Sequence, residues 1–228
     1  MKKVMFGLVA AAAMVACADI ESSNIVGYAS AAMTDGCKML TSQFVTIGST
    51  GTDIQTIKGD GDDLYDFSIQ LLDAYGRTTK SFSWDDWSYD TAMWVDDDGG
   101  TEYTVAPGQG LWVQAKSGYT MTSAGEVQLK DVVVGMVDGC VAVGNPFPIA
   151  VNIQDLVGTG DDLYDFSIQI LDAYGRTAKS FSWDDWSYDT AMWVDDDGAT
   201  EYSVAPGEGL WVQGKAGYTL RIPAPEVK

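Results

Sequence analysis

A near-duplicate pair of segments dominates this 228-residue sequence. Residues 61–120 and 160–219 align without a gap and differ at seven of 60 positions, so 53 are identical. Upstream the correspondence is looser: Asp35-Gly36-Cys37 matches Asp138-Gly139-Cys140, and Phe44 matches Phe147. Each unit is about 100 residues long, the size of one independent domain. The sequence therefore predicts two tandem domains, a first copy over residues 19–125 and a second copy over residues 126–228.

Apolar and polar residues alternate within each copy. Phe67, Ile69 and Leu71 are separated by Ser68 and Gln70, a pattern typical of a strand with one buried face. Several such strands, separated by turn residues, predict an all-β fold in which each copy is a β-sandwich or barrel-like domain.

Three local features refine this prediction. Pro107-Gly108 within Ala106–Gln109 favours a type II turn, in which glycine supplies the positive φ. One short helical turn is expected near residues 54–57 and again near residues 153–156. The junction over residues 126–134 lacks a Pro/Gly/Ser-rich linker and is predicted to be a strand, so the two copies should abut directly.

The first 18 residues have the pattern of a secretory signal peptide. Lys2 and Lys3 precede an apolar run over residues 4–15, and Ala16-Cys17-Ala18 offers a small-residue cleavage site. We expect cleavage after Ala18 and export to the periplasm, the cell surface or the medium. Met14–Cys17 also resembles a lipobox, so a lipid anchor at Cys17 is the alternative. The apolar run is shorter than the ~20 residues of a membrane span, and no transmembrane segment is expected.

The charge of the chain excludes some partners. The formal net charge is −20, and removing residues 1–18 leaves 33 acids against 11 bases, or −22. Such a charge disfavours binding to nucleic acid and anionic membranes. It also predicts self-repulsion in the folded state, which salt should relieve.

Two cysteines remain after the leader. Export permits a disulfide, and Cys37 and Cys140 occupy matching positions in the two copies. They would be able to pair if the copies met about a two-fold axis. Two separate buried thiols are the alternative.

Residues suited to catalysis are scarce. The chain has no histidine, which removes the commonest general base and histidine-ligated zinc. The acids are too numerous for any pair to indicate a glycosidase site. We therefore expect no enzymatic activity and assign no catalytic residues.

Calcium is the one cofactor that the acids suggest. Hard cations bind oxygen ligands from loops, and runs of three aspartates recur in the two copies. The predicted metal ligands are Asp96, Asp97, Asp98, Asp195, Asp196 and Asp197. Plain solvated turns are the alternative interpretation.

Each copy also holds four tryptophans. Trp94 and Trp112 alternate with polar neighbours and are expected in the core. Other aromatic residues flank an Asp-Asp turn, where rings beside carboxylates suit a sugar-binding surface, although core packing is an equal alternative. The predicted ligand-binding residues are Trp84, Trp87, Tyr89, Trp183, Trp186 and Tyr188.

Several short strings resemble a family of exported bacterial repeat proteins of unassigned activity. They are Asn24–Tyr28, Gly144–Phe147, and the Ala-Pro-Gly-x-Gly-Leu-Trp-Val segments at 106–113 and 205–212. The first copy departs from this pattern at Thr41–Phe44. The resemblance implies export and β architecture, and it implies nothing about a ligand.

These observations lead to a functional prediction. The chain is expected to be an exported structural or surface protein that acts through repeated β-domain contact surfaces and binds itself or other cell-surface proteins. The alternative is a pair of carbohydrate-binding modules that bind a polysaccharide.

Overall fold

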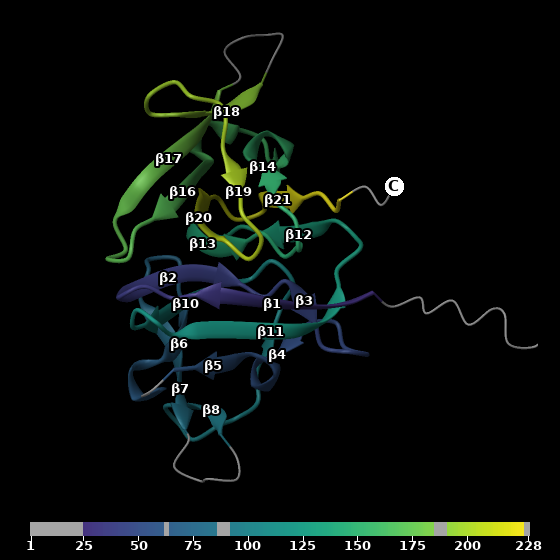
Figure 1. Ribbon diagram of the computed structural model, residues 1–228. Coiled ribbons are helices and arrows are strands. Elements are labelled where there is room, and N and C mark those ends of the chain that lie inside the picture. The colour runs from purple at the N-terminus through teal and green to yellow at the C-terminus, as the bar shows by residue number, and fades with distance from the viewer. Residues whose placement is uncertain (1–24, 62–63, 86–91, 185–190, 226–228) are drawn as a thin grey trace, which may run out of the picture.

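The protein is all-β in this computed structural model, which describes residues 25–61, 64–85, 92–184 and 191–225 (Figure 1). Every strand pair is antiparallel. Helical structure over the described ranges is limited to four 3₁₀ turns of three residues: η1 (Ile54–Thr56), η2 (Leu64–Asp66), η3 (Ile153–Asp155) and η4 (Leu163–Asp165). The all-β prediction and the predicted helical turns near residues 54 and 153 are confirmed, whereas η2 and η4 were not foreseen.

The first copy contributes three sheets. The five-stranded sheet has the order β2 (Gly36–Thr41), β10 (Gly110–Ala115), β6 (Ser68–Leu72), β7 (Thr78–Asp85) and β8 (Met93–Asp96). In the four-stranded sheet β11 (Thr120–Val127) is bordered by β1 (Val26–Ala32), β3 (Phe44–Val45) and β5 (Lys58–Asp60). A two-stranded ribbon joins β4 (Thr52–Asp53) to β9 (Thr104–Val105).

The second copy repeats this plan. Its five-stranded sheet has the order β13 (Gly139–Gly144), β20 (Gly209–Gly214), β16 (Ser167–Leu171), β17 (Thr177–Asp184) and β18 (Met192–Asp195). Its smaller sheet contains β12 (Val132–Gly135), β21 (Thr219–Ile222) and β15 (Val157–Thr159), and its ribbon contains β14 (Val151–Asn152) and β19 (Ser203–Val204).

The smaller sheet is shorter in the second copy because of prolines. β11 continues to Val127 and pairs with β3 there. After Ile222 the second copy instead has Pro223 and Pro225, and Pro148 follows Phe147. Proline has no N–H to donate to a strand partner, so β21 ends at Ile222.

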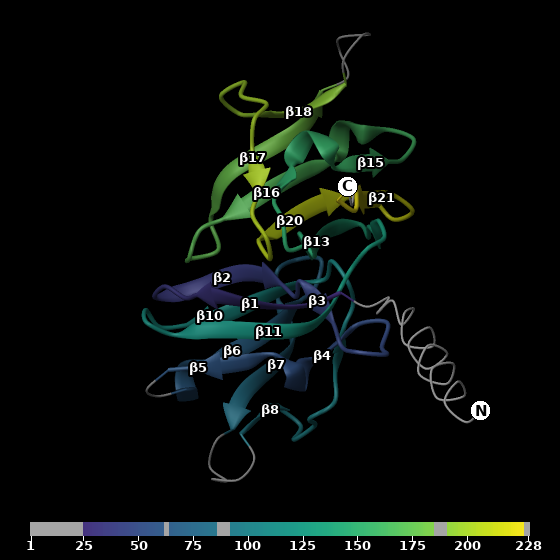
Figure 2. The same ribbon diagram turned by 45° about the vertical axis from the view of Figure 1, so that its right-hand side comes forward.

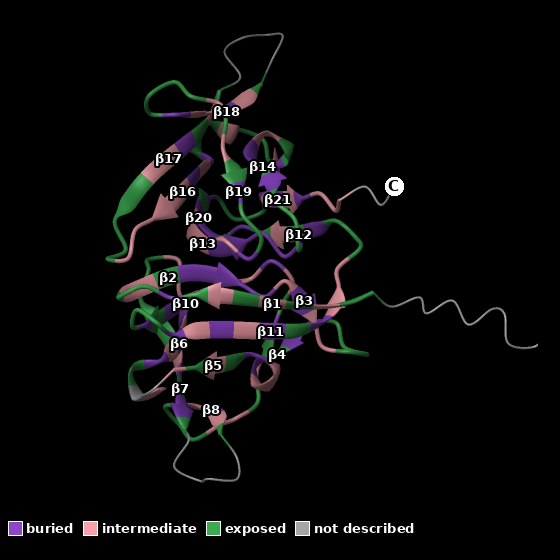
Figure 3. Cartoon of the chain, in the orientation of Figure 1, coloured by how far each residue is buried: buried purple, intermediate pink, exposed green. Residues whose placement is uncertain are grey.

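The buried residues form two hydrophobic clusters, one in each copy. In the first, Leu111 and Val113 from the five-stranded sheet lie with Met121 from the smaller sheet. Burial alternates along β11, as the two-residue period requires (Figure 3). Trp94 and Trp193 are the largest fully buried side chains among the described residues, which confirms the prediction for Trp94.

The predicted turn at Ala106–Gln109 is present. The Gln109 N–H donates to the carbonyl of Ala106 at 3.0 Å, and Gly108 has a φ of 77°. The junction differs from the prediction of one continuous strand. β11 ends at Val127 and β12 begins at Val132, because the chain must leave the smaller sheet of one copy and enter that of the other.

The two copies contact each other through reciprocal hydrogen bonds. The Cys37 N–H donates to the Ala173 carbonyl at 3.0 Å, and the Cys140 N–H donates to the Ala74 carbonyl at 3.1 Å. Ala74 and Ala173 lie in the turns that follow β6 and β16. Equivalent residues exchange roles in these bonds, which is the signature of an approximate two-fold relation.

A second reciprocal pair completes the contact. The Thr41 N–H donates to the Gly207 carbonyl at 3.0 Å, and the Gly144 N–H donates to the Gly108 carbonyl at 3.0 Å. Two turns of the second copy therefore cover the outer edge of β2, and two turns of the first copy cover the outer edge of β13. Open strand edges attract other chains, and these two edges are closed within the molecule.

This arrangement decides two predictions. Cys37 and Cys140 are both free thiols and half-buried. The two cysteines do not pair with each other, and the backbone N–H of each donates to a turn of the opposite copy. Trp112 was expected in the core but is only half-buried. Its ring lies beside Gly175, within 3.6 Å of the place where a Cβ on that glycine would be, and Trp211 lies likewise beside Gly76.

Candidate functional site

The predicted ligand and metal residues that the structure describes lie on the last two strands of each five-stranded sheet or in the turns after them. β7 leads to β8 through residues 86–91, and β17 leads to β18 through residues 185–190. Strands β8 and β18 lie at opposite ends of the molecule in both views (Figures 1 and 2). The predicted ligand residues Trp87, Tyr89, Trp186 and Tyr188 lie outside the described residues.

Trp84 belongs to the core of the first copy. Its exposed fraction is 6 %, and its ring meets Trp94 edge to face at a centroid distance of 5.0 Å and an interplanar angle of 75°. The ammonium of Lys58 lies 5.5 Å from the centroid of the Trp84 ring, a cation–π distance. Trp183 meets Trp193 in the same way at 5.1 Å but is half-buried. Stacking on a sugar needs an open ring face, which Trp84 does not offer in this conformation.

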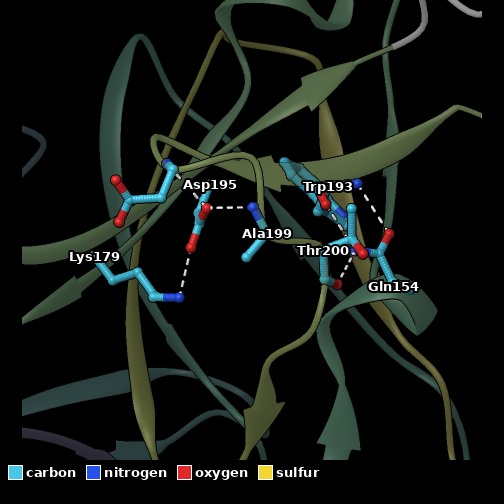
Figure 4. A network of polar contacts seen from close by, with 7 residues as sticks. Gln154, Lys179, Trp193, Asp195, Ala199 and Thr200 are labelled. Atoms are coloured by element: carbon cyan, nitrogen blue, oxygen red, sulfur yellow. Dashed lines mark hydrogen bonds and ion pairs between the residues drawn. The ribbon is translucent and has the colours of Figure 1, made fainter.

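A glutamine side chain closes the outer strand of each five-stranded sheet. In the second copy the Trp193 N–H donates to Gln154 Oε1 at 2.9 Å, and Gln154 Nε2 donates to the Trp193 carbonyl at 2.7 Å (Figure 4). The same Nε2 donates to the Thr200 carbonyl at 2.6 Å. A carboxamide presents an acceptor oxygen and a donor NH2 group, and these are the same kinds of group that the backbone C=O and N–H of a neighbouring strand would present. Gln154 thus takes the place of a sixth strand at this point.

The first copy has the same arrangement around Gln55. Its Nε2 donates to the carbonyls of Trp94 at 2.8 Å and Thr101 at 2.6 Å, and its Oε1 accepts from the Trp94 N–H at 3.0 Å. No functional role was predicted for Gln55 or Gln154. A signal for them did exist, because the pair Ile-Gln recurs at 54–55 and 153–154 within a segment where the two copies correspond only loosely.

Asp96 and Asp195 hold the turns after β8 and β18. Asp195 Oδ2 lies 2.5 Å from Lys179 Nζ, and its Oδ1 accepts the N–H groups of Asp197 at 3.1 Å and Ala199 at 2.6 Å (Figure 4). The bond from the Lys179 ammonium holds the pKa of the Asp195 carboxyl below its usual value, with the backbone bonds adding to the effect.

The same contacts recur in the first copy. Asp96 Oδ2 lies 2.6 Å from Lys80 Nζ, and the carboxyl pKa is lowered for the same reason. The Asp96 bond in turn raises the pKa of the Lys80 ammonium. Both carboxylates are buried, with exposed fractions of 8 % for Asp96 and 7 % for Asp195, so a lysine neutralises each of them.

The six aspartates predicted as metal ligands do not converge. Asp97, Asp98, Asp196 and Asp197 have exposed positions in the turns, whereas Asp96 and Asp195 point at lysines. Over the part of the chain that the structure describes, no three His, Cys, Asp or Glu side chains form a group that would hold a metal ion. Calcium needs six to eight oxygen ligands.

Burial also affects the two thiols. It raises the pKa of Cys37 and of Cys140, although a bond with Trp112 partly offsets the effect at Cys37. A thiol with a raised pKa is a weak nucleophile at neutral pH.

Two surface hollows of about 520 and 530 Å³ lie near the ends of the copies. The first is lined by Ile25, Val45 and Leu129 among others. The second is lined by Ile149, Arg221 and Pro223 among others. Neither hollow contains a predicted ligand or metal residue.

Comparisons with known proteins add no family or relative. The sequence matches no protein-family model, no curated protein and no solved structure. Among the described residues, no helix is long and apolar enough to cross a membrane.

Proposed function

We propose that this chain is an exported, non-enzymatic structural or surface protein that associates with further copies of itself through strand β1. In this proposal each copy is one β-sandwich domain, with the five-stranded sheet packed on the smaller sheet. Residues 1–18 are a signal peptide, and lipidation at Cys17 is the alternative form of export.

The state of strand β1 is the observation that carries the proposal. β1 pairs with β11 along one side and is the last strand of its sheet among the described residues. It is seven residues long, and exposed edges of that length are usually shortened, charged or covered. Residues 25–34 contain no charged side chain in a chain with 33 acids.

Exposed apolar side chains mark the same strand. Val26 is 63 % exposed, Tyr28 is 69 % exposed, and Ile25 beside them is 50 % exposed. Two chains that each carry a net charge of −22 after removal of residues 1–18 repel one another unless they meet through an uncharged surface. An antiparallel pair of β1 strands supplies such a surface together with backbone hydrogen bonds.

The contact between copies supports a structural role. Four reciprocal backbone hydrogen bonds, with N···O distances of 3.0 to 3.1 Å, join the two copies. These bonds occupy the edges of β2 and β13, so those edges are not free for contacts between chains. In this proposal association uses β1 instead.

Light scattering on the purified protein between 10 and 500 mM salt tests the proposal. We expect association that strengthens with salt, and we expect Tyr28→Lys to abolish it. Tyr164→Lys is the matched control, because Tyr164 is 60 % exposed in the second copy. A strictly monomeric protein at every salt concentration, or equal loss with both variants, would contradict the proposal.

A further inference from the structure

Part of the surface that joins the two copies consists of residues that differ between the copies. Thr41 and Gly144 occupy equivalent positions, each four residues after the matched cysteine. They also meet each other, since a Cβ built on Gly144 would lie 2.6 Å from Thr41 Cγ2 and 2.7 Å from Thr41 Cβ. Equivalent residues that touch lie on the approximate two-fold axis.

The Thr41 side chain is buried at this axis. Its exposed fraction is 3 %, and its hydroxyl donates to the Gln109 carbonyl at 2.7 Å. The Thr41 N–H is also bonded to the Gly207 carbonyl of the second copy. One threonine side chain therefore occupies a volume that a second side chain cannot share.

The neighbouring positions show the same imbalance of size. Met39 of the first copy is equivalent to Ala142 of the second. Each faces a glycine of the opposite copy: a Cβ on Gly209 would lie 2.2 Å from Met39 Cγ, and a Cβ on Gly110 would lie 2.7 Å from the Ala142 carbonyl carbon. The facing residue is a glycine at the start of β10 and of β20, whereas the residues that meet these glycines are larger on β2 than on β13.

We infer that the Thr41/Gly144 pair determines which copies recognise each other, so that a first copy accepts a second copy and rejects another first copy. A first copy facing a first copy would place two threonines where one fills the space, and overpacking is destabilising. A second copy facing a second copy would leave the axis empty and lose packing contacts. Specificity of this kind needs both a fit and a clash.

This rule extends to contacts between chains. If the intramolecular contact opens, the exposed β2 surface of one chain fits the β13 surface of another chain and does not fit a second β2 surface. The partner of this surface is thus the unlike copy, in the same chain or in a second one. The near-identical segment 61–120 supplies the shared turns, and the divergent segment before it supplies the selectivity.

A double-mutant cycle in the full chain tests the inference. The variants are Gly144→Thr, Thr41→Gly and the exchange Thr41→Gly with Gly144→Thr, all in a Cys17→Ser background so that Cys37 and Cys140 are the remaining thiols. Gly144 does not have a positive φ, so its backbone accepts threonine. Gly135→Thr is the matched control, because a Cβ on Gly135 would meet nothing within 4 Å and its φ is not positive.

Two readouts separate recognition from general stability. Each single variant should lower the melting temperature by roughly 2–12 °C, and the exchange should recover at least half of the summed loss. The reaction of Cys37 and Cys140 with a thiol reagent should become faster in Gly144→Thr, because the backbone N–H of each cysteine donates a hydrogen bond across the contact. The rate should return to that of the parent in the exchange.

Specific outcomes would overturn the inference. One is additive losses in the exchange, and another is a Gly144→Thr protein that melts and reacts like the Gly135→Thr control. If Gly144→Thr does not fold, Gly144→Ala replaces it in the cycle, since its methyl group already reaches the space that Thr41 fills. Recovery by Thr41→Gly is then required, and its absence counts against the inference.

Discussion

Removal of the Gln154 carboxamide should destabilise the second copy through one well-defined local loss. In the parent protein the Gln154 carboxamide makes three hydrogen bonds of 2.6 to 2.9 Å, with the Trp193 N–H and with the carbonyls of Trp193 and Thr200. In Gln154→Ala these three backbone groups lose that partner. A net contribution of about 1 kcal/mol per hydrogen bond gives a loss of about 3 kcal/mol. For a chain of this length that corresponds to a fall of about 6–12 °C in melting temperature.

The first copy offers an internal duplicate of this experiment. Gln55→Ala removes the equivalent three bonds and should cost the same, and the two losses should add because the sites lie at opposite ends of the molecule. Gln213→Ala is the control, because Gln213 is an exposed glutamine on β20. Chemical denaturation followed by tryptophan fluorescence measures the parent, the three single variants and the double variant Gln55→Ala with Gln154→Ala. A loss in Gln154→Ala no larger than in the Gln213→Ala control would refute the argument that the carboxamide replaces a strand.

Three further predictions follow from the same structure. Trp84→Ala should cost about 3–5 kcal/mol in chemical denaturation, because its buried ring packs on a second buried tryptophan; unchanged stability would contradict that packing. The melting temperature should fall as the pH drops below about 4, since the carboxyl pKa values of Asp96 and Asp195 are lower in the folded state and their protonation releases Lys80 and Lys179; Asp96→Asn with Asp195→Asn should flatten that acid dependence, and an unaltered slope would count against it. Sodium chloride should raise the melting temperature by screening the net negative charge of the chain. Calcium should add little at matched ionic strength because Lys80 and Lys179 bind the two buried carboxylates, and a much steeper rise with calcium would support the predicted calcium sites.

The strands and turns were predictable because they depend on neighbours in sequence. Ile69 and Leu71 are buried on β6 as their alternation with polar residues required. Gly108 adopts the positive φ that its turn demands. In both cases a few adjacent residues carry the whole physical requirement.

Partners distant in sequence were not predictable in the same way. The pattern around Trp112 assigned its side chain to a buried face but did not say that the other copy would supply the cover. Gln55 looked like an ordinary polar residue because its partners Trp94 and Thr101 follow 39 and 46 residues later. Alternation identifies a face, and it does not identify what packs on that face.

The aspartate cluster shows the same limit for a candidate site. Three consecutive acids suggested a cation, and the structure does supply a positive charge to Asp96. The charge is the ammonium of Lys80 on the neighbouring strand, where Phe82 is the register partner of Asp96. Strand register, which the sequence does not state, puts that lysine beside the carboxylate.

The positions of β8 and β18 limit how this chain can use its duplication. The two outer strands lie at opposite ends of the molecule (Figures 1 and 2), so a small ligand bound at one of them cannot also reach the other. Two linked sites strengthen binding only when both can engage the same target. Ligands bound at β8 and at β18 of one chain would therefore lie at opposite ends of the molecule (Figures 1 and 2), too far apart to be one small ligand.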